Sequence, residues 1–230
     1  MWGIRRSAPV VCLPLFGFPH SNTPDLRTKP TRDLFTEFNA GWTHGSKGGT
    51  MSVMPVNSIL TREDLDALPD DGRRHELIDG AFVMSPSPGM GHHDVGAALV
   101  RVLWAATRGT NLKVVSAPFD VALGQHVVVP DLLIAPEGNF TDRDLPVAPL
   151  LAVEIRSPST VWLDEGRKRT LYEEAGVASC WLLDPAIPSI RILELVDGRY
   201  VEIAHAVGDQ TIEVTAPVTI TLNPAELARG

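Results

Sequence analysis

The chain has 230 residues, of which 44% are hydrophobic and 21% are charged, a composition typical of a folded globular protein. Its net charge of -8 counts against a broadly basic surface for polyanions, although a local patch can still bind them. No apolar run reaches the roughly 18 residues that cross a bilayer. The two cysteines, Cys12 and Cys180, do not predict a disulfide. We therefore expect a cytoplasmic protein without a membrane segment.

Residues 1–56 differ in pattern from the rest of the chain. The first 50 contain five Pro and six Gly and show no sustained period of 2 or 3.6. A pair of arginines and the apolar run that follows have a faint similarity to a signal peptide, but two prolines interrupt that run. We expect a disordered extension, or a start codon placed too early with Met51 or Met54 as the true start. The patterned domain is expected over 57–230.

The remaining chain predicts an alternation of helices and strands. In order, we expect a helix over 61–68, a hairpin of 76–78 with 81–84, a helix over 92–108, strands over 113–123, 127–134 and 150–155, a helix over 160–176, a strand over 178–184, short strands over 189–195, 200–205, 211–214 and 218–222, and a helix over 223–227. Pro118 places the 113–123 strand at a sheet edge. This order predicts an α/β fold, with a mixed β-sheet core flanked by helices and a C-terminal β-meander that extends or flanks the sheet.

Two of the apolar strands each contain an acid. Asp131 lies within the run 127–134, and Glu154 follows four apolar residues. Because an unpaired buried charge is costly, we expect these strands to lie side by side and to bring the two acids into one site. The alternative for Asp131 is that it caps a loop at a strand end. Two acids on adjacent strands form a set of hard oxygen ligands suited to Mg²⁺ or Mn²⁺.

Cations follow the second acid. Arg156 shares a strand face with Glu154, where it either stabilises charge during a reaction or forms an ion pair with Glu154 and nothing more. Asp164, Lys168 and Tyr172 fall on one stripe of the next helix. Either Lys168 reaches the acids, or Asp164 and Lys168 form a surface pair worth about 0.3 kcal/mol.

Two further candidates lie earlier in the chain. Glu76 begins the first hairpin and is either a third acid of the site or a solvated carboxylate. His92 and His93 form a pair at a helix N-terminus. No Cys or His cluster has zinc spacing, and the sequence lacks a phosphate loop, a dinucleotide fingerprint and a serine-hydrolase elbow. These absences favour a site built from carboxylates.

An ordered set of motifs extends over roughly 59–227. They are Glu76-Leu-Ile-Asp-Gly, Val129-Pro-Asp-Leu-Leu-Ile, Val153-Glu-Ile-Arg-Ser-Pro-Ser-Thr, Asp164…Lys168…Tyr172 and Gly176-Val…Trp181-Leu-Leu-Asp-Pro. Each motif alone is weak, but the set resembles the Uma-type restriction endonuclease family of the PD-(D/E)XK nuclease superfamily. The resemblance implies a restriction-endonuclease-like fold and metal-dependent cleavage of DNA.

The resemblance also implies roles for single residues. Asp131 and Glu154 match the two acids that bind Mg²⁺ (or Mn²⁺), and Glu76 matches the family's N-terminal acid, a further metal ligand. Arg156 occupies the place of the superfamily lysine, and Lys168 matches versions in which that lysine has moved to the next helix. Lys168 is thus expected to stabilise charge and orient water, with Arg156 assisting, since an arginine does not act as a base. His92, Asp164 and Tyr172 are expected to support the site.

A second class of function stays open at this stage. From Met51 onward there are 14 Lys and Arg residues against 25 Asp and Glu residues, and the visible basic cluster is Arg167-Lys168-Arg169. Such an acidic body is also compatible with an inactive nuclease-like domain that binds nucleic acid or a protein without cutting. The C-terminal meander could serve a homodimer, because enzymes that cut two strands often work as dimers.

Overall fold

The computed structural model describes residues 52–53, 59–69, 73–85, 87–157 and 163–230, without the side chains of 52–53 and 163–165. Residues 48–230 form one compact unit. Of the predicted extension over 1–56, only Ser52–Val53 is described, as strand β1. Among the described residues, no helix is both long enough and apolar enough to span a membrane.

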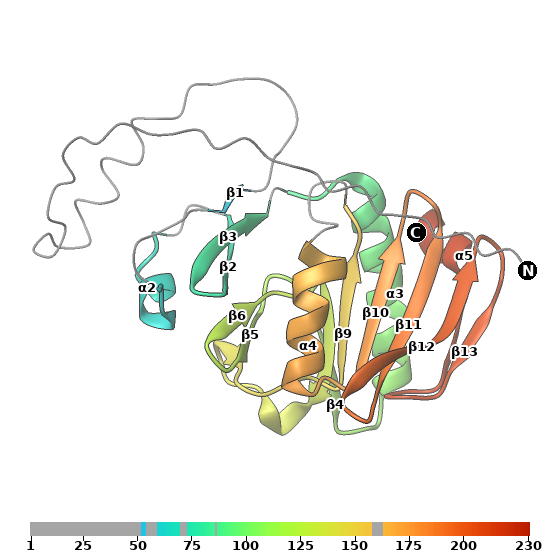
Figure 1. Ribbon diagram of the computed structural model, residues 1–230. Coiled ribbons are helices and arrows are strands. Elements are labelled where there is room, and N and C mark those ends of the chain that lie inside the picture. Colours follow the sequence, from blue (N-terminus) through green and yellow to red (C-terminus); the bar gives the residue numbers. More distant parts are fainter. Residues whose placement is uncertain (1–51, 54–58, 70–72, 86, 158–162) are drawn as a thin grey trace, which may run out of the picture. The chain divides into compact units, whose positions relative to one another are not determined.

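A six-stranded mixed sheet is the centre of the domain (Figure 1). Its strand order is β12-β11-β10-β9-β7-β4. The strands are β12 (Arg199–Val207), β11 (Ser189–Val196), β10 (Ser179–Asp184), β9 (Leu151–Ile155), β7 (Leu132–Pro136) and β4 (Leu112–Ser116). Strand β9 runs parallel to β10 and antiparallel to β7. Every residue of β9 is buried, as expected for a central strand covered on both faces.

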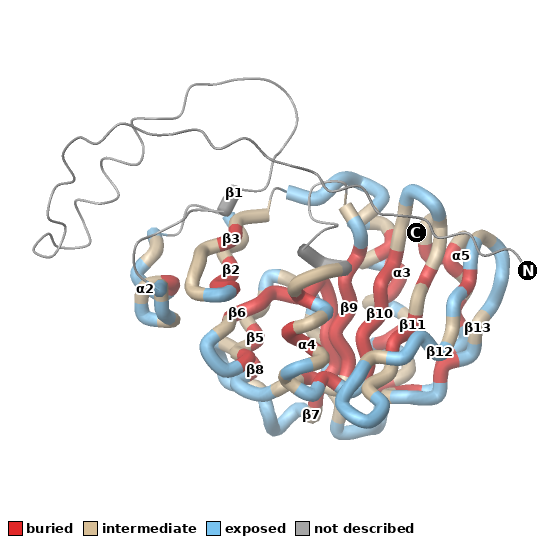
Figure 2. Tube along the Cα trace, viewed as in Figure 1, coloured by how far each residue is buried: buried red, intermediate tan, exposed pale blue. Residues whose placement is uncertain are grey.

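Helices cover the two faces of this sheet. On one face lie α3 (Met90–Thr107) and the C-terminal α5 (Pro224–Arg229), which pack on Leu151, Val153 and Trp181. On the other face lies α4 (Arg169–Ala175), whose Leu171 and Tyr172 pack on residues such as Ala152 and Cys180. Figure 2 shows the buried strands enclosed between these layers. Helix α4 ends at Gly176, which has the left-handed φ of 81° that the sequence pattern predicts for a helix stop.

A second six-stranded sheet has the order β1-β3-β2-β6-β5-β8. Its remaining strands are β3 (Ala81–Ser85), β2 (Arg74–Ile78), β6 (His126–Val128), β5 (Asp120–Leu123) and β8 (Asp144–Leu145). The predicted hairpin is confirmed as β2 and β3, joined by Asp79 and Gly80 with positive φ values of 52° and 70°. The short α2 (Arg62–Asp66) begins at Thr61, which forms a capping box with Asp64.

Two predicted strands are wrong as single elements. The segment 113–123 is divided into β4 and β5, which belong to different sheets, with Pro118 in the break. Only β4 has the predicted edge position in its sheet. The segment 127–134 is likewise divided into β6 and β7. Pro130 has no N–H for a sheet ladder, and at this point the chain passes from one sheet to the other.

The helix boundaries and the meander differ in smaller ways. Helix α3 begins at Met90, so His92 lies within its first turn. Before α4 the chain forms a π-helical turn, η4 (Leu163–Lys168), and the predicted cap Thr160 lies outside the described residues. A short helix η3 (Glu137–Asn139) and β8 occupy the predicted polar loop. Strands β11 and β12 extend the central sheet, whereas β13 (Ile212–Val214) and β14 (Ile220–Leu222) form a separate pair.

Candidate active site

The ends of two neighbouring strands hold the first two acids. Strands β7 and β9 pair with Leu132 opposite Val153, so Asp131 and Glu154 are the next residues along this ladder. The Asp131 N–H donates to the Val153 carbonyl at 3.0 Å, and the Ile155 N–H donates to Asp131 Oδ2 at 2.8 Å. The expectation that the two strands lie side by side is therefore confirmed, and the two acids occupy opposing positions at the end of the pair; that they act as one site stays a prediction. The expectation that Asp131 lies inside a strand is wrong, because it lies in the break just before β7.

Asp131 is held as an anion by groups from three elements. Besides the Ile155 amide, His92 Nε2 of α3 lies 3.1 Å from Oδ2, and Arg74 Nη1 of β2 donates to Oδ1 at 3.1 Å. Burial alone would raise the pKa of Asp131, but the hydrogen bond and charge of His92 and the charges of Arg74 and Lys168 outweigh it and lower the pKa to about 2. The carboxylate thus stays ionised over the whole physiological range.

Lys168 lies fully buried between two acids. Its Nζ is 2.7 Å from Glu154 Oε1 and 3.2 Å from Glu76 Oε1, and it donates to the Val129 carbonyl at 3.2 Å. The interpretation of Lys168 as part of a surface pair is therefore wrong, since its side chain has 0% exposure. The side chain of Asp164, the other member of that pair, lies outside the described residues. Lys168 is the last residue of η4, and such π-helical turns are frequent at functional sites.

Tyr172 binds the same acid one turn further along the helix. Its hydroxyl donates to Glu154 Oε1 at 2.5 Å, and both groups are buried. Burial first, and the neighbouring Glu154 charge second, raise the pKa of Tyr172 well above its usual value, so the hydroxyl keeps its proton. Lys168 and Tyr172, spaced i and i+4, thus fix one oxygen of Glu154 from the helix side.

Glu76 is buried, so the interpretation of a solvated hairpin carboxylate is wrong. Its Oε1 accepts the Val129 N–H at 2.7 Å and lies against Lys168. Its Oε2 is buried and finds no hydrogen-bond partner among the described residues. A buried carboxylate oxygen without a partner is costly and marks a place where a further positive group would be favourable.

Arg156 lies outside this buried cluster. It follows β9, and its Nη1 donates to Asp184 Oδ2 at 2.8 Å while nearly half of its side chain is exposed. Arg156 and Glu154 nevertheless line the same hollow beside the sheet. Because its side chain is partly exposed, Arg156 is better placed to contact a molecule that arrives from solvent than to act beside the buried Lys168.

Arg74 is a site residue that the sequence did not reveal. It contacts Asp131, and although burial alone would lower the pKa of its guanidinium, Glu76, Asp131 and Glu154 raise that pKa above its usual value. Its signal was weak because Arg73-Arg74-His75 is a polar run beside a turn, which is typical of solvent-exposed chain. Arg74 and Asp131 are 57 positions apart in the sequence, so their contact becomes apparent only in the structure.

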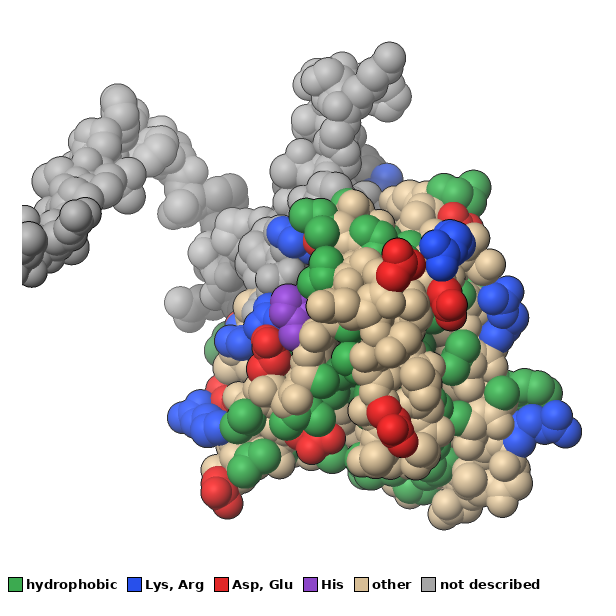
Figure 3. All heavy atoms as spheres, turned by 90° about the vertical axis from the view of Figure 1, so that its right-hand side faces the viewer, with side chains coloured by type: hydrophobic (Ala, Val, Ile, Leu, Met, Phe, Trp, Pro, Cys, Tyr) green, Lys and Arg blue, Asp and Glu red, His purple; other side chains and the backbone are tan. Residues whose placement is uncertain are grey.

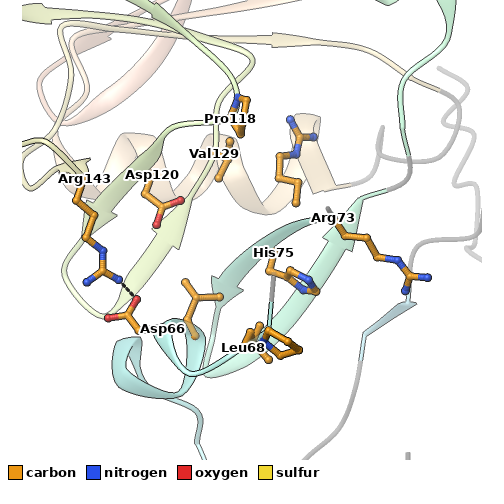
Figure 4. Close-up of a pocket in the computed structure, with 11 residues that line it drawn as sticks. Asp66, Leu68, Arg73, His75, Pro118, Asp120, Val129 and Arg143 are labelled. Atoms are coloured by element: carbon orange, nitrogen blue, oxygen red, sulfur yellow. Dashed lines mark hydrogen bonds and ion pairs between the residues drawn. The ribbon is translucent and has the colours of Figure 1, made fainter. Parts of the chain in front are cut away.

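A hollow of about 280 Å³ begins at Arg74 and Val129 and extends away from the acids. Figure 4 shows Asp120 and Arg143 on one side of it and Leu68 and His75 on the other, with Asp66 bound to Arg143. Together with the hollow that includes Glu154 and Arg156, the acid cluster is thus bordered by two arginine-containing depressions. Of the two hollows, only the one beside Arg156 is lined by one of the acids, Glu154.

The side chains of this cluster determine whether it can hold a metal ion. Among the described side chains, no three His, Cys, Asp or Glu residues form a ready-made metal cluster. Lys168 and Arg74 lie among the acids and separate them electrostatically. Mg²⁺, however, is commonly held by only one or two carboxylates together with water and substrate phosphate. Asp131, Glu154 and the unpartnered Glu76 Oε2 are hard oxygen donors that fit this mode of binding.

The mixed sheet, with acids at the ends of two adjacent strands and a lysine from the following helix against them, defines a restriction-endonuclease-like fold. The family model Uma2, described as "Putative restriction endonuclease", matches residues 62–225, and the chain belongs to this family. The recognised resemblance is thereby confirmed.

A solved structure supports the same fold. It is described as "a putative nuclease belonging to DUF820 from Anabaena variabilis", and its similarity covers 74% of this chain and 98% of that chain with a TM-score of 0.61. The sequence identity is 18%, so the likeness concerns the fold alone. No curated protein matches the chain.

Proposed function

We propose that the protein is a metal-dependent endonuclease that hydrolyses phosphodiester bonds of DNA. The observation that carries the proposal is the buried lysine held between Glu154 and Glu76, next to the ionised Asp131. Burying three carboxylates costs free energy, and apolar side chains would fill a purely structural core at a lower cost. Strongly perturbed ionisable groups at strand ends are a common feature of catalytic sites.

Each residue has a role that its contacts support. Asp131 and Glu154 would hold Mg²⁺ or Mn²⁺, with Glu76 as a further ligand through its unpartnered oxygen. Lys168 would orient the attacking water and stabilise charge on the phosphorane-like transition state. His92 and Arg74 keep Asp131 ionised and fixed, and Tyr172 fixes one oxygen of Glu154 through its hydrogen bond. The supporting role of Asp164 is proposed from the sequence alone.

The metal would add what the side chains lack. Bound at these carboxylates, Mg²⁺ or Mn²⁺ would supply positive charge for the scissile phosphate and lower the pKa of water at the site. The chain's own cations leave that need in place, because Lys168 is already neutralised by Glu154 and Glu76. The residues present therefore favour a reaction that requires an added divalent cation.

A non-cutting binding module is the second candidate. Its support is the charge distribution: 14 Lys and Arg residues against 25 Asp and Glu residues from Met51 onward. On the face shown in Figure 3, basic side chains are spread among acidic and hydrophobic ones and form no continuous patch. Under either candidate function we propose a homodimer, which would double the contact with a duplex. We also propose a reducing compartment such as the cytoplasm.

Nicking of supercoiled plasmid by the purified protein in Mg²⁺ or Mn²⁺ tests the enzyme directly. We expect conversion to open circles that stops with EDTA and falls at least about 10³-fold in Glu154→Gln, because the charge that binds the cation is removed while the volume is kept. Nicking by Glu154→Gln at the wild-type rate, or undiminished nicking by the wild type in EDTA, would refute the proposal. DNA binding without any nicking would favour the binding module.

A further inference from the structure

A row of residues crosses the central sheet from the acid cluster toward its far edge. In the strand register, Glu154 of β9 lies opposite Leu182 of β10, and Leu182 lies opposite Arg191 of β11. Directly opposed residues in a sheet point to the same face, so Arg191 shares the face of Glu154. Adjacent strands are about 4.8 Å apart, which places the Arg191 backbone about 10 Å from that of Glu154. Figure 1 shows these three strands side by side.

This face is hollowed between the two residues. The hollow has a volume of about 130 Å³ and is lined by Glu154, Arg156, Leu182, Leu183, Asp184, Ser189 and Arg191. Glu154, whose side chain is 2% exposed, thus lines a hollow that also contains two arginines. A molecule bound in this hollow would lie close to both arginines and to the acid.

Each of the two arginines forms an ion pair with a neighbouring acid and has a partly exposed side chain. Arg156 binds Asp184 at 2.8 Å, and Arg191 Nε binds Glu202 Oε2 at 2.7 Å. The exposed fractions of their side chains are 45% and 39%. A guanidinium carries five N–H donors, and Arg191 bonds Glu202 through its Nε. Anchored arginines lose little further freedom on binding, and their planar fork suits phosphate oxygens.

We propose that Arg191, together with Arg156, binds the backbone phosphate that neighbours the scissile phosphate of the substrate strand. The assignment rests on the proposed function, since it gives the nucleic acid its path across the site. The strand would then run from the acid cluster over Leu182 to Arg191. Within an acidic domain, this hollow offers two arginines beside the reactive acid, where a polyanion must be bound.

Binding of a fluorescent DNA duplex in Ca²⁺, followed by anisotropy at several salt concentrations, tests the assignment in the full chain. We expect Arg191→Gln to weaken binding roughly five- to twentyfold and to reduce the slope of log affinity against log salt by about one, as for the loss of one phosphate contact. Arg199→Gln is the matched control. Arg199, the first residue of β12, forms an ion pair with Glu173, so this change also removes one positive charge. We expect the Arg199→Gln protein to bind DNA as tightly as the wild type.

A second variant separates the phosphate contact from the ion pair itself. Glu202→Gln breaks the pair with Arg191 but keeps the cation, so binding should stay within about twofold of wild type or tighten. Weakening by Glu202→Gln equal to that of Arg191→Gln would overturn the assignment, as would an Arg191→Gln protein that matches Arg199→Gln.

The outcome also distinguishes the subsite from the reaction. If the wild type nicks plasmid while Arg191→Gln binds normally, the subsite is wrong and the nuclease function stands. If the wild type binds DNA without nicking and Arg191→Gln binds weakly, the subsite stands and the reaction is wrong. A wild type that binds no DNA overturns both.

Discussion

Two clusters in this domain combine one cation with several carboxylates, and they differ in burial. In the lysine cluster, Lys168 lies between Glu154 and Glu76 with 0% of its side chain exposed. In the arginine cluster, Arg62 of α2 binds Asp66, Asp120 and Asp144 with 23% of its side chain exposed. The second cluster links α2 to strands β5 and β8. Its ion pairs are partly exposed, so they can hold these elements together with little desolvation penalty.

The net pKa shifts of acids in the two regions also have opposite directions, although burial raises the pKa in both. Burial, the largest cause, raises the pKa of Asp120 in the arginine cluster despite the opposing charges of Arg62 and Arg143, and the charges of Asp144 and Asp66 add to the rise. Near the lysine cluster, cations and a hydrogen bond overcome burial and lower the pKa of Asp131 to about 2. An excess of directed donors around a buried acid thus distinguishes the candidate site from an ordinary ion-pair network.

The largest contrast is expected in the free energy of unfolding. Lys168→Met leaves Glu154 and Glu76 buried without their cation and should destabilise the fold by about 3–5 kcal/mol. Arg62→Met should cost only roughly 1 kcal/mol, because its partners turn to solvent. Urea unfolding of both variants, with unchanged m-values, measures the difference. Similar losses in the two proteins would remove the distinction between the clusters.

A smaller effect is expected in the pH dependence of stability. The pKa of Asp131 is depressed in the folded state, so its contribution is present above its unfolded pKa near 4 and is lost as pH falls toward 2. The shift corresponds to about 2.5 kcal/mol. Chemical unfolding between pH 6 and pH 2 should therefore show a steeper acid loss for wild type than for Asp131→Asn. Parallel curves for the two proteins would be incompatible with an ionised, cation-bound Asp131.

The smallest contrast concerns two tyrosine hydroxyls, one buried (Tyr172) and one partly buried (Tyr200). Tyr172→Phe removes a hydrogen bond to the Glu154 carboxylate and should cost roughly 1.5–3 kcal/mol, as for bonds to charged groups. Tyr200→Phe removes a 2.8 Å bond to the neutral Val177 carbonyl and should cost about 1 kcal/mol. Thermal or urea unfolding ranks the two. A reversed order would mean that Tyr172 does not position Glu154.

Much of this arrangement could be predicted from local sequence. The Asp79-Gly80 turn, the apolar strand around Glu154 and the helical spacing of Lys168 and Tyr172 are short-range patterns, and each has its counterpart in the structure. The contact between the Asp131 and Glu154 strands followed from the cost of burying two charges apart.

The features that were missed depend on contacts between distant segments. The split of 113–123 and 127–134 between two sheets is decided by which strands they meet, and residue periodicity carries no information on that choice. Arg74 resembles any arginine beside a turn until β2 is placed next to the chain before β7. Arg156 binds Asp184 on the parallel strand, 28 positions away, and no spacing rule connects the two residues.

Calorimetric titration with Mn²⁺ tests the central claim, that the buried acids near Lys168 are a divalent-cation site and the acids near Arg62 are not. We predict binding to the wild type and to Asp66→Asn, and loss of binding in Glu154→Gln. Thermal unfolding without metal confirms that each variant is folded. Undiminished binding by folded Glu154→Gln, or no binding by the wild type, would contradict the account.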